Sequence, residues 1–264
     1  MRKVNGSTGN SMWTTTASSY ITDDFVVDGN GDAYIVGTDY PGTIIYIDKI
    51  LSNGTKTWTK TYTGFYGFGG DPVHLKMDQS GNLLLALNAT NNVGDRYLSV
   101  AKFDTVGTNP AQVWHNAYTS NIGEVKDFML DNTTNASYVT GSISNGGTFN
   151  DMIVYKSGPA GAINWSATYH NATINSYDAG YSVDQDPAGN VYVASRSAAG
   201  GNNEYTVRKY TSGGGVLATA VIAYAGYLYN DQPKIKIHPG NGQIYLGGTS
   251  EATSGDQQMT LYKS

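Results

Sequence analysis

A lysine that ends a β-like run recurs five times along this chain, at almost constant intervals. The lysines are Lys49, Lys102, Lys156, Lys209 and Lys263, which are 53, 54, 53 and 54 residues apart. They close the runs IIYIDK, YLSVAK, MIVYK, YTVRK and MTLYK. A fixed period of this kind is typical of architectures in which one supersecondary unit is copied along the chain. We therefore expect five copies of one β-rich unit.

Two further markers keep the same period. A turn between two apolar runs begins at Asp28, Asp78, Asp131, Asp186 and His238. A tryptophan follows a polar turn at Trp13, Trp58, Trp114 and Trp165, whereas the fourth copy (212–224) has none. Each copy thus contains several short strands joined by turns, and the blade that lacks a tryptophan should be the weakest because it has the least flat apolar area to bury.

The repeat length and the chain ends together predict a closed ring. Units of about 40 to 50 residues with four strands are typical of β-propeller blades. Residues 1–18 hold a tryptophan strand with nothing before it, and residues 231–264 hold three strands that stop at the last lysine. We expect a single all-β domain over 1–264, a five-bladed β-propeller with four antiparallel strands per blade. The N-terminal strand would complete the C-terminal blade, giving blades near 19–63, 64–118, 119–169, 170–224 and 225–264 plus 1–18.

Composition excludes several function classes. The net charge of −5 and the pI near 5.2 argue against nucleic acid as a partner, since that requires clustered lysine and arginine. No apolar run reaches the roughly 18 to 20 residues of a membrane span, and the N-terminus lacks the apolar core of a signal peptide. The absence of cysteine excludes disulfides, thiol catalysis and cysteine-ligated metal.

The segment AGYSVDQDPAGNVYVAS (179–195), followed by a lysine strand and a glycine-rich turn, resembles the bacterial and archaeal SBBP-type propeller repeat. The resemblance covers essentially the whole chain, closely in 179–195 and loosely in 124–140 and 231–247. It implies a propeller of secreted or surface proteins and no particular reaction. Such repeats are often associated with more blades than the five expected here.

An acidic residue opens the inner strand of every expected blade: Asp23 or Asp24, Asp71, Glu124, Asp178 and Asp231. These carboxylates would ring one mouth of the tunnel, where they either cap backbone N–H groups of their own loops or bind a cation or polar ligand. The sequence DGNGD (28–32) resembles the start of a calcium loop but also suits a hairpin turn, which we favour. We expect no cofactor and at most weak calcium binding.

Aromatic side chains accompany the carboxylates in the loops between outer and inner strands, and such pairs suit sugar or protein recognition. The expected ligand-binding residues are Phe65, Tyr66, Phe68, Asp71, Tyr177, Asp178, Tyr227, Tyr229 and Asp231. Asp95, Asp151, Glu204 and Asp256 should lie on the same side of the molecule. The histidines His74, His115, His170 and His238 fall at four different phases of the repeat, so we expect no shared metal site and no catalytic residue.

These features favour a non-catalytic extracellular or cell-surface propeller that binds a protein or glycan through one face, or that assembles by exchanging its first strand between copies. The alternative is a lectin-like carbohydrate-binding propeller, and a glycosidase or lyase comes third. Equivalent pockets in all blades would favour a lectin, whereas one irregular pocket would favour an enzyme. Glycosylation acceptors at Asn5, Asn53, Asn132 and Asn135 would shield the opposite face.

Overall fold

The structure is a computed structural model that describes residues 1–16, 20–39, 42–63, 73–90, 94–107, 111–144, 150–171, 177–199, 202–222, 227–228, 232–252 and 257–263. All regular elements in these residues are strands, paired in antiparallel sheets. This confirms the all-β prediction. No helix among the described residues is long and apolar enough to cross a membrane.

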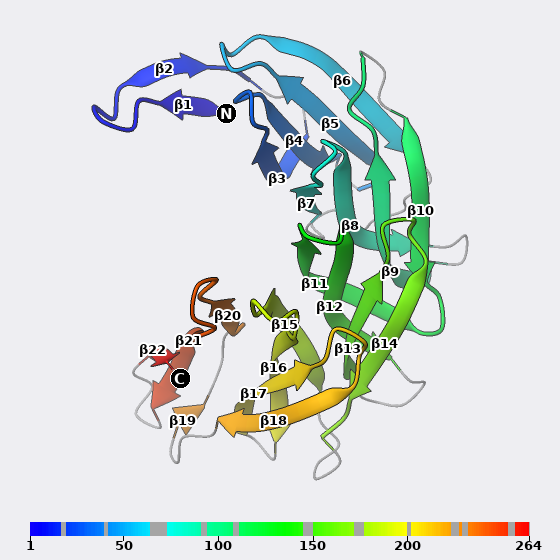
Figure 1. The fold of residues 1–264 in the computed structure, drawn as a ribbon, viewed down its shortest axis with the longest axis vertical. Coiled ribbons are helices and arrows are strands. Elements are labelled where there is room, and N and C mark those ends of the chain that lie inside the picture. The colour runs from blue at the N-terminus through cyan, green and yellow to red at the C-terminus, as the bar shows by residue number, and fades with distance from the viewer. Residues whose placement is uncertain are drawn as a thin grey trace. The chain divides into compact units, whose positions relative to one another are not determined.

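The first compact unit, Met1–Ala117, contains a two-stranded sheet and two four-stranded sheets (Figure 1). The two-stranded sheet pairs β1 (Arg2–Val4) with β2 (Ser11–Thr14). The next has the order β3 (Ile21–Val27), β4 (Ala33–Thr38), β5 (Ile44–Ile50) and β6 (Lys56–Thr63). The last has the order β7 (His74–Met77), β8 (Leu83–Thr90), β9 (Arg96–Phe103) and β10 (Gln112–Tyr118).

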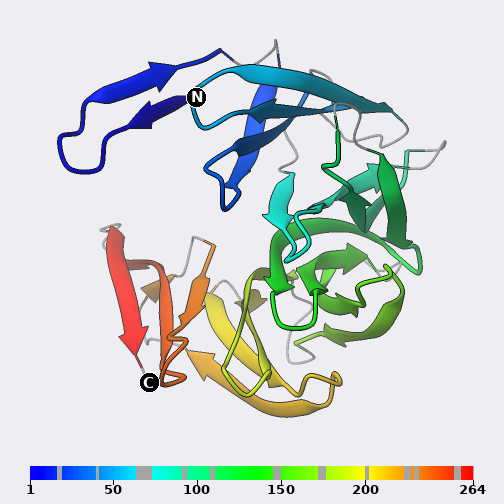
Figure 2. The same cartoon turned by 45° about the horizontal axis from the view of Figure 1, so that its top comes forward.

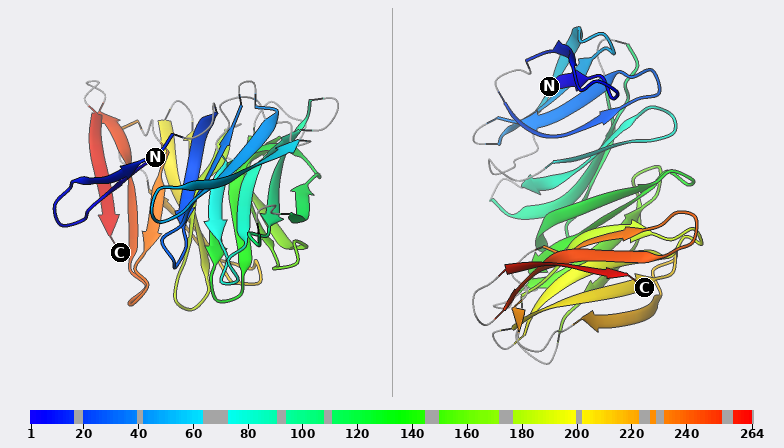
Figure 3. Two further views of the ribbon diagram at one scale, coloured as in Figure 1. Left: turned by 90° about the horizontal axis from the view of Figure 1, so that it is seen from above. Right: turned by 90° about the vertical axis from the view of Figure 1, so that its left-hand side faces the viewer.

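The second unit, Tyr118–Ser264, contains three four-stranded sheets. One has the order β11 (Ile122–Asp131), β12 (Ala136–Ser144), β13 (Asn150–Ser157) and β14 (Ile163–Tyr169). The next has the order β15 (Asp178–Gln185), β16 (Val191–Ala199), β17 (Asn202–Tyr210) and β18 (Val216–Ile222). In the last, β19 (Tyr227–Leu228) and β20 (Lys234–Ile237) both pair with β21 (Ile244–Ala252), which also pairs with β22 (Gln257–Lys263) (Figure 3).

In two copies the repeated lysine pairs with the repeated turn aspartate, which fits the period that they share. Lys102 Nζ lies 2.7 Å from Asp78 Oδ2, and Lys209 Nζ lies 3.5 Å from Asp186 Oδ2. The turn aspartates also accept backbone N–H groups of their own turns. In the first copy, Lys49 pairs with Asp32 at 3.4 Å instead. Asp28 Oδ1 accepts hydrogen bonds from two backbone N–H groups of the DGNGD segment, which is therefore a hairpin turn as predicted.

Carboxylates on first strands tie neighbouring sheets together. Asp24 Oδ2 accepts the backbone N–H of Leu75 at 2.9 Å. In the second unit, Asp127 Oδ2 accepts that of Val183 at 3.0 Å. Asp184 Oδ2 accepts that of Ile237 at 2.9 Å in the same way. Each bond satisfies a strand N–H that faces away from its own sheet.

Tryptophans dock onto a glycine turn of the next sheet. Trp165 in β14 donates its Nε1–H to the carbonyl of Ser212, at 3.0 Å, and its ring lies against Gly214. Trp13 in β2 does the same to the carbonyl of Ser52, at 2.9 Å, and to Gly54. The strand β2 therefore contacts the sheet of β3–β6 in the same way as the outer strand β14 contacts the sheet that follows it.

The inner face of the first sheet differs from its counterparts. Phe25 is 54% exposed, whereas Leu75, Phe128, Val183 and Ile235 are at most 3% exposed. A groove of about 750 Å³ borders Phe25 and is lined by residues of β1 to β4, mostly with apolar side chains.

Two details differ from the expected strand plan. A strand precedes the tryptophan strand, because RKV (2–4) pairs with SMWT (11–14) around the polar turn between them (dark blue in Figure 2). The prediction that nothing lies before the tryptophan strand is therefore wrong, since a three-residue strand is too short for the alternation of side chains to reveal it. The partner of residues 11–14 is β1, whereas the expected partner was the lysine strand of the last blade.

Candidate active site

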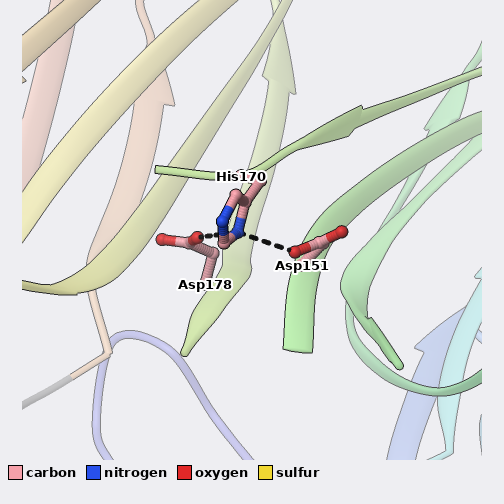
Figure 4. A group of neighbouring side chains, drawn as sticks. All are labelled: Asp151, His170 and Asp178. Atoms are coloured by element: carbon pink, nitrogen blue, oxygen red, sulfur yellow. Dashed lines mark ion pairs between the residues drawn. The ribbon is translucent and has the colours of Figure 1, made fainter. Parts of the chain in front are cut away.

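The most distinctive group of polar side chains in the second unit joins three segments of the repeat. Asp151 lies at the start of β13, His170 directly follows β14, and Asp178 is the first residue of β15. The pairing of Met152 with Tyr169 brings Asp151 beside His170. Asp178 Oδ2 accepts the backbone N–H of Asn171 at 2.9 Å, which anchors the segment after β14 to the next sheet. All three side chains converge (Figure 4).

The two carboxylates contact the same nitrogen of the histidine. His170 Nδ1 lies 3.0 Å from Asp151 Oδ1 and 3.6 Å from Asp178 Oδ2 (Figure 4). The Asp178 side chain is fully buried and that of Asp151 is 13% exposed, whereas 42% of the His170 side chain is exposed. The imidazole is thus partly exposed to solvent, while its Nδ1 contacts the two carboxylates.

This arrangement can perform proton transfer. A carboxylate at Nδ1 fixes the tautomer that has its proton on Nδ1, so Nε2 is an acceptor for another proton. The supporting carboxylates also stabilise the imidazolium that forms. The same three residue types bind divalent cations, and one ligand atom from each lies within 4.8 Å of the others.

The combination is not repeated at the equivalent positions of the other copies. Asp151 stands five residues before its repeat lysine, where the other copies have Ile44, Tyr97, Glu204 and Gln258. His170 stands five residues after its tryptophan, where the first and second copies have Thr63 and Thr119. The site is therefore a local departure from the repeat.

Two of the expected ligand-binding residues belong to this neighbourhood. Asp178 is part of the cluster, and the hydroxyl of the preceding Tyr177 lies 3.4 Å from that of Ser142. The backbone of Tyr227 lies in β19. The expected residues Phe65, Tyr66, Phe68, Asp71, Tyr229 and Asp231 lie outside the described residues. Asp151, which was expected on the same side as Asp178, contacts the same nitrogen of His170.

The carboxylates that open the inner strands have different roles. Asp178 caps a backbone N–H of the loop before it, as expected for a structural carboxylate. Asp24 caps the N–H of Phe25 and binds the next sheet, and Glu124 Oε1 lies 2.6 Å from Lys126 Nζ. Burial raises the pKa of Asp23 to about 6, because the charged form loses hydration.

The four glycosylation acceptors lie in turns. Asn5 is exposed between β1 and β2, and its Oδ1 accepts the N–H groups of Ser7 and Thr8. Asn53 is exposed in the β5–β6 turn. Asn132 is exposed and Asn135 half-buried in the β11–β12 turn, where Asn135 has a positive φ of 55°.

His170 is a candidate functional residue that was not predicted from the sequence. Its phase in the repeat differs from those of the other three histidines, so no histidine partner was expected. Its partners are carboxylates that stand 19 residues before it and 8 residues after it. The signal that could have found it was the coincidence of a strand-end histidine with two acidic strand starts in one copy alone.

No family model matches this chain, and no curated protein matches it. The SBBP-type resemblance thus stays a prediction. Solved structures do share the fold. A polysaccharide lyase of family PL25, an ulvan lyase bound to -[GlcA(1-4)Rha3S]-, has a TM-score of 0.58 and 12% identity, over 93% of this chain and 72% of that one.

Two other solved structures resemble this chain with lower TM-scores. An endo-arabinase from Bacteroides thetaiotaomicron has a TM-score of 0.47 at 10% identity, over 94% of this chain and 95% of that one. A eukaryotic initiation factor has a TM-score of 0.50 at 11% identity, over 100% of this chain and 59% of that one. At such identities the likeness shows a β-propeller-like fold, and the function must be argued from the site.

The comparisons correct the expected function. The sequence favoured a non-catalytic binding or structural module and no enzyme, whereas the solved structures that share this fold include a polysaccharide lyase. No catalytic motif stands out in the sequence, because the candidate site combines residues from three separate segments. A catalytic group needs to occur only once.

Proposed function

We propose that this protein is a carbohydrate-active enzyme that cleaves an acidic polysaccharide by β-elimination, with His170 as the general base. One observation carries the proposal: two carboxylates contact Nδ1 of a single, partly exposed histidine. That support directs Nε2 toward solvent as a proton acceptor. The likeness of the fold to that of a polysaccharide lyase supports the same class of reaction.

The proposed step needs no redox partner. Nε2 of His170 removes the proton at C5 of a uronate, which the adjoining carboxyl group makes acidic. The electron pair of that C–H bond forms the C4=C5 double bond. The C4–O bond to the next sugar breaks, and its oxygen leaves with a proton from solvent or an acid. Asp151 and Asp178 stabilise the imidazolium formed in this step.

Elimination fits the cluster better than glycoside hydrolysis does. A glycosidase places two carboxyl groups on either side of the scissile bond, with one as acid and the other as base or nucleophile. Here both carboxylates hold the same imidazole nitrogen, and the Asp178 side chain is fully buried. Asp178 therefore cannot touch a substrate.

The single occurrence of the site also favours an enzyme over a lectin. A repeat lectin presents similar pockets in each copy, whereas the equivalents of Asp151 in the other copies are Ile44, Tyr97, Glu204 and Gln258. Catalysis requires only one set of catalytic groups, and the other repeats then have a structural role.

The test is cleavage of uronate-containing polysaccharides, followed by the ultraviolet absorbance of the unsaturated product. His170→Asn should lower the rate at least about 100-fold, since a general base contributes about 10² to 10⁴. The control is His238→Asn, which changes a histidine in an exposed turn. Full activity of His170→Asn would refute the proposal, as would binding of the polymers without any cleavage.

Measuring activity in the presence of a chelator distinguishes proton transfer from metal binding at this site. If His170 acts as a base, EDTA should leave the rate unchanged, and we expect neither a required cofactor nor more than weak calcium binding. Loss of activity in EDTA that is restored by a divalent metal would instead assign Asp151, His170 and Asp178 to a metal centre.

We further propose that the five four-stranded sheets are the blades of one propeller and that the N-terminal strand completes the C-terminal blade. Two observations support this. Among the described residues, the sheet of β19 to β22 has three strand positions, because β19 and β20 share one edge of β21. Trp13 donates a hydrogen bond to a turn of the sheet of β3 to β6. Trp165, in the outer strand β14, donates one in the same way to a turn of the sheet of β15 to β18. Closure would also cover Phe25.

An extracellular or cell-surface location follows as part of the proposal. Polysaccharides of useful length do not enter cells intact, so an enzyme that cleaves them must meet them outside. The partner would be a glycan. Acceptors exposed in turns, such as Asn5 and Asn53, are compatible with that location.

A further inference from the structure

Three cationic side chains gather around Tyr181 in the second unit. Lys126 Nζ lies 6.0 Å from the centre of the Tyr181 ring, and the guanidinium carbon of Arg196 lies 5.5 Å from it. Lys234 Nζ donates a hydrogen bond to the Tyr181 carbonyl at 3.2 Å. Tyr181 is only 5% exposed. We call Lys126, Tyr181, Arg196 and Lys234 the Tyr181 cluster.

Backbone irregularities place two members of this cluster. The register between β11 and β12 shifts between Val125 and Asp127, which makes Lys126 the extra residue. The register between β15 and β16 shifts between Gly180 and Ser182, which does the same for Tyr181. A bulge turns a side chain away from its regular direction, and bulges are over-represented beside functional sites. The cluster thus depends on a geometry that a regular ladder would not give.

The charges of the cluster suit an anionic ligand. Cations that share one aromatic ring repel one another, and an anion between them removes that repulsion. Lys126 already binds one carboxylate, that of Glu124, at 2.6 Å. Lys234 is exposed, and an ammonium has three donors, so it can hold the Tyr181 carbonyl and a ligand oxygen together. Arg196 offers a planar fork that matches a carboxylate or sulfate.

The cluster is connected to the candidate active site through one strand. Asp178 and Tyr181 both lie in β15, and Arg196 pairs with Ala179, the residue after Asp178. Three residues of strand span about 10 Å. The Tyr181 cluster therefore lies about that distance along β15 from the Asp178 side of the candidate active site.

We infer that the Tyr181 cluster is a second subsite, which binds the carboxylate or sulfate group of a sugar adjacent to the one that reacts at His170. The inference rests on the proposed carbohydrate function and adds a specificity. The enzyme selects polymers that carry acidic groups on neighbouring sugars, and Lys234 and Arg196 hold the second group.

The experiment measures binding by calorimetry in the His170→Asn variant, so that the ligand is not consumed. The probes are an oligogalacturonate, a sulfated oligosaccharide without uronate, and a neutral oligosaccharide. The oligogalacturonate or the sulfated probe should bind at least 10-fold more tightly than the neutral one. Lys234→Gln should weaken that binding about 5-fold or more. The matched control is Lys236→Gln, which removes the same charge two residues along β20 from a side chain that is 80% exposed.

Each outcome of this experiment either supports or overturns the inference. Preference for the oligogalacturonate identifies a carboxylate subsite, and preference for the sulfated probe identifies a sulfate subsite. Equal binding of all three probes, or equal losses in Lys234→Gln and Lys236→Gln, would overturn it. Acidic probes that bind through Lys234 but are never cleaved by the wild-type protein would refute the proposed elimination while leaving this subsite intact.

Discussion

Asp23 is one side chain through which pH should affect the stability of this protein. It is the extra residue where the register of β3 and β4 shifts, and one of its oxygens, Oδ2, is buried without a hydrogen-bond partner among the described residues. Burial raises the pKa of its carboxyl to about 6, while a hydrogen bond from Thr38 opposes the shift. In the unfolded chain the same group titrates near 3.8.

The sign of the stability effect follows from these two values. Between pH 3.8 and about 6 the folded state binds more protons than the unfolded state, so stability falls as pH rises. The Asp23→Asn substitution removes the titrating group and with it this loss of stability. We expect it to raise the free energy of unfolding above pH 6 by about 1 kcal/mol, after allowance for partial exposure, and to have little effect below pH 4. Urea unfolding across this pH range measures the difference.

Asp39→Asn is a control of opposite sign. Hydrogen bonds from Thr43 and the backbone of Ile44 hold the pKa of Asp39 below its usual range. Its substitution should therefore destabilise the protein at neutral pH and lose that effect as pH falls. Equal pH profiles for the two variants would show that the burial of Asp23 does not matter.

At this scale the sequence predicted roles for carboxylates better than for the histidine. Asp151 and Asp178 were placed on one side of the molecule from strand direction, because alternation along a chain is a local property. His170 required a contact between three segments, and neither its spacing nor its neighbours marks it as a base. The Tyr181 cluster depends on bulges, and a bulge leaves no composition signal in this chain.

Turn glycines beneath tryptophans control how one sheet is held to the next. Gly54 has a φ of +92°, and a Cβ there would lie 2.8 Å from Trp13 Cγ. Gly94 has the same φ of +92° with nothing within 4 Å of an added Cβ. Substitution of either glycine therefore produces the same backbone strain, but only Gly54 has a tryptophan ring against it.

Alanine at the two positions separates backbone strain from docking. Gly94→Ala should lose about 1 kcal/mol of stability, from the left-handed backbone alone. Gly54→Ala should lose about 1 to 3 kcal/mol more, because the new methyl group displaces the Trp13 ring. Denaturant unfolding of both variants gives the comparison. Equal losses would mean that Trp13 does not rest on this turn in solution.

The strands themselves were largely predictable. The lysine runs, the turn aspartates and the glycines with positive φ all repeat, and each is fixed by local chemistry. The order of strands within the sheet of β7 to β10 follows the expected inner-to-outer sequence. The strand β1 was missed because its three residues carry too short a pattern.

For the molecule as a whole, the N-terminal segment should be essential. Met1, Trp13 and Tyr20 pack against the buried residues Ala33, Ile35 and Ile50. Deletion of residues 1–18 uncovers that apolar surface and frees sheet edges that can pair with other chains. We expect a melting temperature lower by roughly 10 °C or more, or aggregation, in thermal unfolding with light scattering.

A shorter deletion supplies the control for that result. Removal of residues 1–5 takes away β1 but keeps Trp13, so the loss of stability should be smaller. If the chain without residues 1–18 melts at the same temperature as the intact chain, the N-terminal strand does not complete any sheet.

The aspartate ties between first strands imply strong coupling between adjacent repeats. When one sheet frays, the backbone N–H of Leu75, Val183 or Ile237 loses its acceptor, so disorder in one copy raises the free energy of the next. Repeats with large nearest-neighbour interaction energies melt over long stretches rather than unit by unit. We expect the weakest copy to be the fourth, whose outer strand β18 has no tryptophan and leaves Val216, Leu217 and Val221 each 53% exposed. Amide hydrogen exchange should begin there and spread.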